Sequence, residues 1–308
     1  MSARLFMSSG DMIADRRFDY ARDLQLSGDL VAAADLFQQA TDLAPGFATA
    51  WFTLGEVREQ LGDRAGAILA FRSARRTDAG DRNGAGLRLM RLGADELSAM
   101  PSTYVTALFD QYAPKFDIAL GDLGYCGPAV LLQAVHDAGA GAAPAFFHHV
   151  IDLGCGTGLA ARAFAADNDG IIGIDLSPRM IELARATGLY ATLEVADIVD
   201  ALAGKPTASA DLILAADVMV YVHDVAPLLA EAARVLMPGG LLALTAETHG
   251  GDGVVLVQGL RYAHSAGHLR SSLAAAGLTL LLLDSVSSRH ESGAPVPGLV
   301  AVAAKHHG

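Results

Sequence analysis

Three glycines and an aspartate stand at a spacing that could hold a charged ligand. The segment from His149 to Leu159 is an apolar run that opens into a turn with Gly154, Gly156 and Gly158 at alternate positions. Glycine lets the backbone approach a ligand where a Cβ would collide. Asp152, just inside the turn, could serve a ligand that carries an ammonium and a sulfonium. The segment therefore predicts a cofactor pocket at the end of a buried strand.

The residues after the turn indicate which ligand it suits. A helix expected from Leu159 to about Ala166 would present free N–H groups to a carboxylate. A dinucleotide-binding turn has its third glycine where this chain has Leu159. Asp152 would also lie badly near a pyrophosphate. The pattern thus disfavours a dinucleotide.

Two further apolar runs end in acidic residues. Ile171 to Leu176 predicts a second strand, with Asp175 about twenty residues after the first glycines, where a carboxylate can accept both hydroxyls of a ribose. Leu193 to Ile198 predicts a third strand, with Asp197 placed for an adenine amino group and Ile198 for the ring face. Asp197 could instead only cap the following turn.

The remaining apolar runs complete an alternation of strands and helices. The fourth strand is expected at Ala210 to Asp217 and the fifth at Leu241 to Ala246, after a Pro-Gly-Gly turn at residues 238–240. Leu278 to Val286 and Leu299 to Ala304 would close the sheet as an antiparallel pair. This alternation predicts an α/β, doubly wound fold.

Residues 104 to 305 together resemble class I S-adenosylmethionine-dependent methyltransferases, with the glycine turn as their motif I. The resemblance implies a Rossmann-like, doubly wound, seven-stranded sheet with an antiparallel last strand. It also implies S-adenosyl-L-methionine as cofactor and S-adenosyl-L-homocysteine as product. The cofactor contacts expected from it are Tyr112, Asp152, Gly154, Cys155, Gly156, Gly158, Asp175, Leu176, Met180, Asp197, Ile198 and Ala216.

An aromatic segment before the turn resembles the lead-in of small-molecule methyltransferases. In that group an aromatic-rich helix covers the cofactor as a lid, and Tyr112 is the candidate lid contact. Leu108, Tyr112 and Phe116 have helical spacing, so simple docking on the sheet is an equal alternative.

Methyl transfer from a sulfonium is an in-line displacement that needs alignment more than acid or base. An acceptor hydroxyl or ammonium must, however, lose a proton. The candidate groups follow the fourth strand or lie in later loops, and we expect them to be Tyr221, His223, Tyr262 and His264, with Asp217 and His268 as further possibilities. Each histidine taken singly is more often structural than catalytic.

The acceptor is only partly constrained by the sequence. Asp217-Val218-Met219-Val220 stands where amino-methylating relatives carry an Asn/Asp-Pro-Pro-Tyr motif, and the chain has no Pro-Cys pair for attack on pyrimidines. We therefore expect a methyltransferase, an enzyme acting on a small-molecule or protein acceptor. The alternative is a scaffold or sensor that binds S-adenosylmethionine without turnover.

The first ninety residues contain an internal repeat. A shift of about 34 residues aligns Gly28-Asp29 with Gly62-Asp63 and Phe37 with Phe71, and this period is typical of tetratricopeptide repeats. We expect two repeats, capped by a helix from Asn83 to Leu92. The predicted domains are residues 1–95, an all-α repeat domain, and residues 96–308, the methyltransferase domain.

Several arginines gather at the end of the repeat domain. They are Arg72, Arg75, Arg76, Arg82, Arg88 and Arg91. A solvated, partly salt-bridged face is the favoured interpretation, and a surface for an acidic protein partner is the alternative.

Composition excludes other classes of function. The net charge is −12; the first 95 residues hold 12 Lys/Arg and 13 Asp/Glu, and the rest hold 10 and 21. So acidic a catalytic domain should repel nucleic acid. We expect no membrane span, no disulfide from Cys126 and Cys155, no metal site and a cytoplasmic protein.

Overall fold

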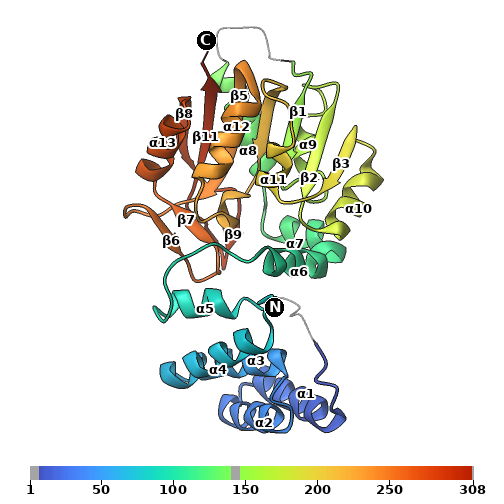
Figure 1. The fold of residues 1–308 in the computed structure, drawn as a ribbon, viewed down its shortest axis with the longest axis vertical. Coiled ribbons are helices and arrows are strands. Elements are labelled where there is room, and N and C mark those ends of the chain that lie inside the picture. The colour runs from blue at the N-terminus through green and yellow to red at the C-terminus, as the bar shows by residue number, and fades with distance from the viewer. Residues whose placement is uncertain (1–6, 140–145, 307–308) are drawn as a thin grey trace. The chain divides into compact units, whose positions relative to one another are not determined.

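The computed structural model describes residues 7–139 and 146–306 and forms two compact units (Figure 1). The helical unit comprises Met1–Gln111 and Gln258–Leu260, and the sheet unit comprises Tyr112–Val257 and Arg261–Gly308. The sequence places the division after residue 95, whereas the units divide after Gln111.

The helix before this division belongs to the helical unit for a local reason. Thr103 donates its hydroxyl to the carbonyl of Gly80, and the ring of Tyr104 fills the space where Gly84 lacks a side chain, 2.7 Å from an ideal Cβ. Helix α6 (Ser102–Tyr112) is therefore fastened to the segment that precedes α5 (Ala85–Arg91).

The helical unit begins with two consecutive helix pairs. The pairs are α1 (Met12–Ser27) with α2 (Leu30–Leu43) and α3 (Ala48–Gln60) with α4 (Arg64–Thr77). Both inter-helix turns use the same chemistry: Gly28 and Gly62 adopt φ of +90° and +80°, and the next residue, Asp29 or Asp63, caps the second helix. The 34-residue repeat in the sequence thus corresponds to a repeated turn.

Aromatic side chains fill the helical unit. Phe18 lies with its ring centroid 5.3 Å from that of Phe37 and 5.1 Å from that of Phe47. Gly55 lets α3 approach α4 closely, because an ideal Cβ on it would lie 2.6 Å from the ring of Phe71. Small residues at these positions therefore set the distance between paired helices.

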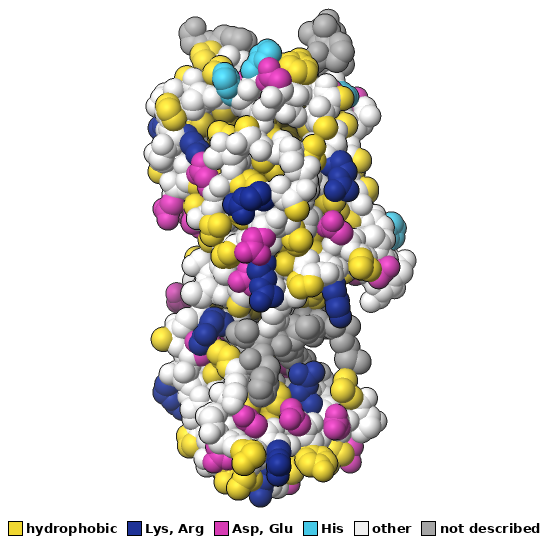
Figure 2. All heavy atoms as spheres, turned by 90° about the vertical axis from the view of Figure 1, so that its right-hand side faces the viewer, with side chains coloured by type: hydrophobic (Ala, Val, Ile, Leu, Met, Phe, Trp, Pro, Cys, Tyr) yellow, Lys and Arg dark blue, Asp and Glu magenta, His cyan; other side chains and the backbone are white. Residues whose placement is uncertain are grey.

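Most of the clustered arginines are paired with acids of the same unit. Arg88 binds Glu56 at 2.7 Å and Arg82 binds Asp78 at 3.1 Å, while Arg91 and Arg75 pair with Glu59 and Asp95. On the face drawn in Figure 2, basic and acidic side chains are interspersed. These pairs favour the salt-bridged interpretation of the arginine cluster.

The sheet unit contains a mixed sheet whose main path is β3-β2-β1-β4-β5-β11-β8. These strands are β1 (Val150–Leu153), β2 (Ile171–Asp175), β3 (Thr192–Val195), β4 (Ala210–Ala215), β5 (Leu236–Glu247), β8 (Leu278–Val286) and β11 (Gly298–Lys305). Strands β1 to β5 run parallel, and β11 is antiparallel to both of its neighbours. Two short strands off this path, β6 (Val254–Leu256) and β7 (Tyr262–His264), make nine strands instead of the expected seven.

Helices cover both faces of the sheet. Alternate residues of β4 point to opposite sides: Ile213 packs in a core with α11 (Ile198–Ala203), α12 (Ala226–Val235) and α13 (Ala266–Ala275), and Leu212 in a core with α8 (Gly127–Ala138) and α9 (Leu159–Ala163). The doubly wound architecture is therefore present. The chain reverses its direction of strand addition between β1 and β4, and ligands of such sheets bind at this point.

Several local expectations were wrong in detail. Helix α9 ends at Ala163, before the expected Ala166. Residues 238–240 lie within β5, because Gly239 adopts a φ of +81° and the pairing with β4 shifts register there. The aromatic lead-in is not one helix: α6 is followed by a 3₁₀ turn at Ala113–Lys115 and by α7 (Phe116–Asp122).

The other elements of the sheet unit are short. They are α10 (Pro178–Thr187), the 3₁₀ turn η2 (Met219–Tyr221), and the hairpin of β9 (His290–Glu291) and β10 (Ala294–Pro295). Across the described residues, no single helix has both the length and the apolarity of a membrane span, and one bent pair, Ser102–Asp122 with Gly127–Ala138, meets that test only in combination.

We predict that Gly55→Ala lowers the free energy of unfolding of the helical unit by about 1–3 kcal/mol, because the added methyl group overlaps the ring of Phe71. Gly46→Ala is the matched control, since an ideal Cβ at Gly46 has no neighbour within 4 Å and its φ is not positive. Denaturant unfolding followed by circular dichroism measures both. Equal stability of the two variants would contradict the packing role of Gly55.

Candidate functional site

The glycine turn lies between β1 and α9, and all three glycines have positive φ. The values are +62° at Gly154, +53° at Gly156 and +95° at Gly158. An ideal Cβ on Gly154 would lie 2.6 Å from Val218, and one on Gly158 would lie 3.1 Å from Tyr190. Among these three, only Gly156 would carry a Cβ at an ordinary contact distance, with its nearest neighbour, Phe116, at 3.7 Å. Two of the glycines therefore make room for protein side chains, and Gly156 is the one whose Cβ would not be crowded by the protein.

Asp175 fixes the turn to the end of β2. Its Oδ2 accepts a hydrogen bond of 2.9 Å from the N–H of Gly156, and its Oδ1 accepts one of 2.8 Å from the N–H of Ser177. The side chain is 8% exposed. Each carboxylate oxygen has a second lone pair, so the same group can also accept ligand hydroxyls.

Asp152 is buried at the end of β1 with a free acceptor. Its Oδ2 accepts a 2.7 Å hydrogen bond from the hydroxyl of Tyr190, whereas Oδ1 has no hydrogen-bond partner in the described part of the chain. Burial raises the pKa of Asp152 to about 7, the bond from Tyr190 opposes this rise, and the charge of Asp175 adds to it. An orphaned, buried carboxylate oxygen fits the ammonium group of an amino-acid ligand.

Cys155, one of the expected cofactor contacts, is buried in the turn. Its N–H donates to the carbonyl of Ile174 at 3.0 Å, and its side chain lies with Ile181 and Ala184. Burial raises the pKa of the thiol, so it stays protonated and is no nucleophile.

The residues expected at the adenine end have mixed environments. Asp197 caps α11 by accepting from the N–H of Val199 at 2.8 Å, which is the alternative that the sequence left open. Leu176, Ile198 and Ala216 are half-buried. Met180 is fully buried and donates its N–H to Ser177, so its side chain lies in the core and not on a solvent-reachable wall.

The lead-in contacts the turn one helical turn later than expected. Tyr112 is half-buried at the end of α6. The contacts with the turn come from Phe116, near Gly156, and from Asp117, which accepts a 2.6 Å hydrogen bond from the hydroxyl of Thr157. Phe116 could be found from its helical spacing with Tyr112, but nothing local in the sequence indicates the role of Asp117.

The four catalytic candidates come from two elements that meet, with the ring centroids of His223 and Tyr262 5.4 Å apart. Tyr221 and His223 follow β4 and are half-buried. His264 and Tyr262 lie on β7 and have no exposed surface. Nε2 of His264 donates to the carbonyl of Met219 at 3.0 Å, and burial lowers the pKa of this histidine. Burial raises the pKa of Tyr262 to about 12. The pairing of β7 with β5 buries both side chains within the sheet unit. A structural role therefore accounts for the positions of His264 and Tyr262.

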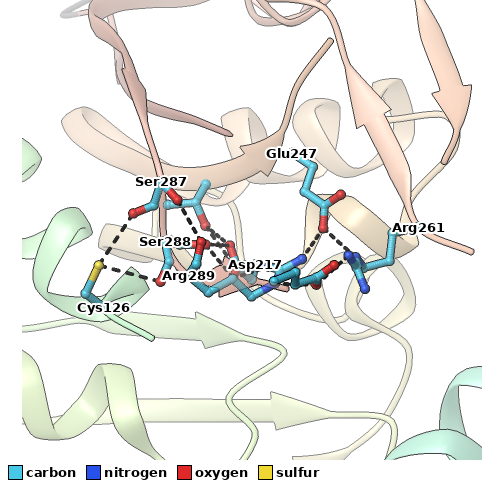
Figure 3. Close-up of polar contacts among 9 residues, drawn as sticks. Cys126, Asp217, Glu247, Arg261, Ser287, Ser288 and Arg289 are labelled. Atoms are coloured by element: carbon cyan, nitrogen blue, oxygen red, sulfur yellow. Dashed lines mark hydrogen bonds and ion pairs between the residues drawn. The ribbon is translucent and has the colours of Figure 1, made fainter. Parts of the chain in front are cut away.

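Asp217 is held by a network instead of facing an acceptor (Figure 3). Its carboxylate accepts from Nη1 of Arg289 at 3.1 Å, from the hydroxyl of Ser288 at 3.0 Å and from the hydroxyl of Thr245 at 2.7 Å. These bonds hold Asp217 at a φ of +53°. All its neighbours are donors, so Asp217 is committed to structure and is a poor candidate for a base.

Two guanidinium groups are neutralised within the same network (Figure 3). Arg289 also pairs with Glu247 and, at 3.1 Å, with Glu291; Arg261 pairs with Glu247 and, at 2.7 Å, with Glu291. Burying two such cations requires carboxylate partners, and here three are present. An anionic acceptor would find both arginines already occupied.

Tyr125 lies near the Asp217 network, and the sequence did not indicate it. The next residue, Cys126, donates its N–H to the carbonyl of Ser288 at 2.8 Å, which fastens this loop to the Asp217 network. Burial raises the pKa of Tyr125, and the charge of Asp217 adds to the rise. The phenol is thus a neutral group, close enough to Asp217, Asp152 and Tyr221 to respond to their charges.

Comparisons with known proteins agree with this geometry. Residues 151–244 match the family described as Methyltransferase domain. Over 99 residues the chain is 33% identical to ubiquinone biosynthesis O-methyltransferase of Xanthomonas oryzae pv. oryzae, covering 31% of this chain and 41% of that protein. Over 146 residues it is 30% identical to methyltransferase-like protein 27 of Homo sapiens, covering 46% and 57%. The chain spans about two fifths of the length of the first relative and less than two thirds of the second.

Solved structures share the fold at low sequence identity. The [4+2]-cyclase SpnF has a TM-score of 0.54 at 22% identity, covering 70% of this chain and 100% of that one. The 1,6-didemethyltoxoflavin-N1-methyltransferase of Burkholderia thailandensis, solved with S-adenosylhomocysteine, has a TM-score of 0.52 at 19% identity, covering 69% and 93%. The sheet unit therefore shares the fold of these two proteins, and residues 151–244 match the model of a methyltransferase domain.

Proposed function

We propose that the sheet unit transfers a methyl group from S-adenosyl-L-methionine to a small-molecule or protein acceptor and releases S-adenosyl-L-homocysteine. The observation that carries this proposal is the buried Oδ1 of Asp152, which has no hydrogen-bond partner among the described residues and lies at the end of β1, next to the glycine turn that Asp175 holds. A carboxylate in that position is costly for the protein alone and becomes favourable with a cationic ligand. The match to a methyltransferase domain supports the same conclusion.

Each end of the cofactor has a matching group in this proposal. Asp152 would hold the ammonium group and Asp175 the ribose hydroxyls. Gly156 would leave room for the ligand, and Asp197 and Ile198 would lie at the adenine. The bound sulfonium supplies the methyl group and leaves as a neutral thioether, so the protein's task is to align the acceptor and exclude water.

The acceptor would approach the edge formed after β4. Tyr221, His223 and Tyr125 are the polar groups that we propose there, because Asp217, Tyr262 and His264 are occupied or buried. Two neutral phenols and a histidine suit a neutral acceptor. The relatives named O-methyltransferases favour a hydroxyl as the methylated group.

The helical unit supplies the second part of the proposal. We propose that its helix pairs are two tetratricopeptide repeats with α5 as the capping helix, that they dock a protein partner, and that the protein is cytoplasmic. The repeated Gly-Asp turns support the repeat assignment. A scaffold or sensor without turnover remains the competing function, because a cofactor pocket alone does not prove transfer and one protein of similar fold is a cyclase.

A labelled-methyl screen tests the function directly. Purified protein is incubated with methyl-labelled S-adenosylmethionine and fractionated cell extract. We expect label in a small molecule or in a protein. Cofactor binding without labelling of any fraction would favour the scaffold or sensor.

Asp175→Ala should weaken S-adenosylhomocysteine binding by at least about 1.5–3 kcal/mol, because charge-assisted hydrogen bonds to the ribose are lost. The variant also loses the bonds that hold Gly156 and Ser177. Calorimetry measures the change, with Asp252→Ala, at an exposed loop position, as control. Unchanged affinity in Asp175→Ala, or a wild type that binds NAD and ignores S-adenosylhomocysteine, would overturn the pocket assignment.

Asp152→Asn should bind S-adenosylhomocysteine at least tenfold more weakly and yet be the more stable protein without ligand. The pKa of Asp152 is about 7 in the folded chain and about 4 in an unfolded one, so ionisation removes stability as the pH rises from about 4 to about 7. We expect the variant to gain about 2–4 kcal/mol of unfolding free energy at pH 8 and little at pH 4.5. Denaturant unfolding at both pH values measures this, and an equal effect at both would argue against a buried charge.

A shortened chain that begins at Ser98 should fold and bind S-adenosylhomocysteine with nearly wild-type affinity, because the sheet unit has its own apolar cores. Circular dichroism and calorimetry measure the two properties. A soluble chain that no longer binds would assign the helical unit a part in the pocket.

A further inference from the structure

We propose that Tyr190, which lies outside every cofactor motif, is a positioning residue. It keeps the carboxylate of Asp152 ionised and leaves one of its two oxygens free for the ammonium group of the cofactor. The inference rests on the proposed function. It adds a residue that neither the glycine turn nor the strand-end acids would indicate.

The geometry fixes one oxygen of Asp152 and leaves the other. Tyr190 lies in the loop between α10 and β3, and its hydroxyl donates to Oδ2 of Asp152 at 2.7 Å. The carboxylate is 1% exposed, so water cannot replace this donor. The bond to Oδ2 fixes the plane of the carboxylate. The other oxygen, Oδ1, has no hydrogen-bond partner among the residues that the structure describes.

The surrounding backbone is shaped for the ring of Tyr190. An ideal Cβ on Gly158 would lie 3.1 Å from Cε2 of the ring, and one on Gly173 would lie 2.7 Å from Cε1. These glycines belong to two different elements, the turn after β1 and strand β2. Phenylalanine would fill the same space, so packing accounts for the ring. The hydroxyl bonds Asp152 and also interacts with the thiol of Cys155.

The charged and titratable groups around Asp152 explain why a donor is needed. Asp175 on β2 disfavours the ionised form of Asp152, as does burial. Cys155 in the turn and Tyr125 before α8 stay neutral, because burial raises the pKa of both. Tyr190 supplies the one interaction among these that lowers the pKa of Asp152. An ammonium group binds a carboxylate more strongly than a protonated acid. The hydroxyl of Tyr190 and the ammonium group of the cofactor therefore both favour the ionised form of Asp152.

The test is calorimetric titration with S-adenosylhomocysteine between pH 5.5 and 8.5. The proteins are the wild type, Tyr190→Phe, Asp152→Asn and the double variant. Tyr20→Phe removes a hydroxyl from a tyrosine that is 69% exposed on α1 and serves as the matched control. Tyr190→Phe should bind about tenfold more weakly at pH 5.5 and about fivefold more weakly at pH 7, because the midpoint of its pH dependence should rise by about one unit from the pKa of about 7. At pH 8.5, where Asp152 is again ionised, the loss should shrink to about threefold or less.

Three outcomes separate this role from simple packing. A loss that is the same at every pH, or that is as large in the Asp152→Asn background as in the wild type, would overturn the proposal. Loss of effect in that background supports it, because the hydroxyl then acts through Asp152.

A wild type that does not bind S-adenosylhomocysteine would sink the proposed function, and Tyr190 can still be examined without ligand. The difference in unfolding free energy between wild type and Asp152→Asn reports the ionisation of Asp152 as a function of pH. Introducing Tyr190→Phe into both proteins should raise the pH at which this difference stops changing, near the folded pKa of about 7, by about one unit and leave its lower end near pH 4 in place. An upper end that does not move would overturn the coupling of Tyr190 to Asp152.

Discussion

The buried carboxylate of Asp152 is the interaction on which the rest of the site depends. Burying an acid at the apolar end of β1, close enough to Asp175 to feel its charge, is unfavourable in the absence of compensating groups. The protein compensates in part, through the hydroxyl of Tyr190 and through backbone N–H groups that stabilise the carboxylate of Asp175. The rest of the cost of burying the charge of Asp152 would be offset by a cationic ligand bound at its Oδ1. The glycines follow from this arrangement, since two of them make room for Tyr190 and Val218.

A second constraint is the network of ion pairs at the carboxyl ends of β4 and β5. Asp217 after β4 and Glu247 at the end of β5 bind Arg289, and this holds residues 287–291 against the carboxyl ends of both strands. The loop of Tyr125 and Cys126 is fastened to Ser288 of the same segment. The network thus positions the neutral phenol of Tyr125 close enough to Asp217 and Asp152 to respond to their charges, while the charges of the network pair with one another. Because the charged groups of this network bind one another, Tyr125 and Tyr221 are among the polar groups left to contact the acceptor. This agrees with a reaction that needs alignment of the acceptor more than an acid or a base.

The parts of the site that could be predicted from the sequence are those with local spacing. The glycine turn, Asp175 at the end of its strand and the succession of strands along the chain all follow from patterns within about twenty residues. Tyr190 and Asp152 are separated by 38 positions, and Arg289 and Asp217 by 72, so no local pattern indicates either pair. The burial of Tyr262 and His264 was not foreseen, because the short strand β7 has no distinct periodicity and its pairing with β5 buries both side chains. The Pro-Gly-Gly segment suggested a turn, yet β5 continues through it by a register shift.

The most direct measurement of the central claim is a crystal structure of the protein with S-adenosylhomocysteine. The account predicts the ligand ammonium within hydrogen-bond distance of Oδ1 of Asp152, with Tyr190 still bound to Oδ2, and the ribose hydroxyls on Asp175. A ligand bound elsewhere, or one whose ammonium group contacts neither oxygen of Asp152, would contradict it.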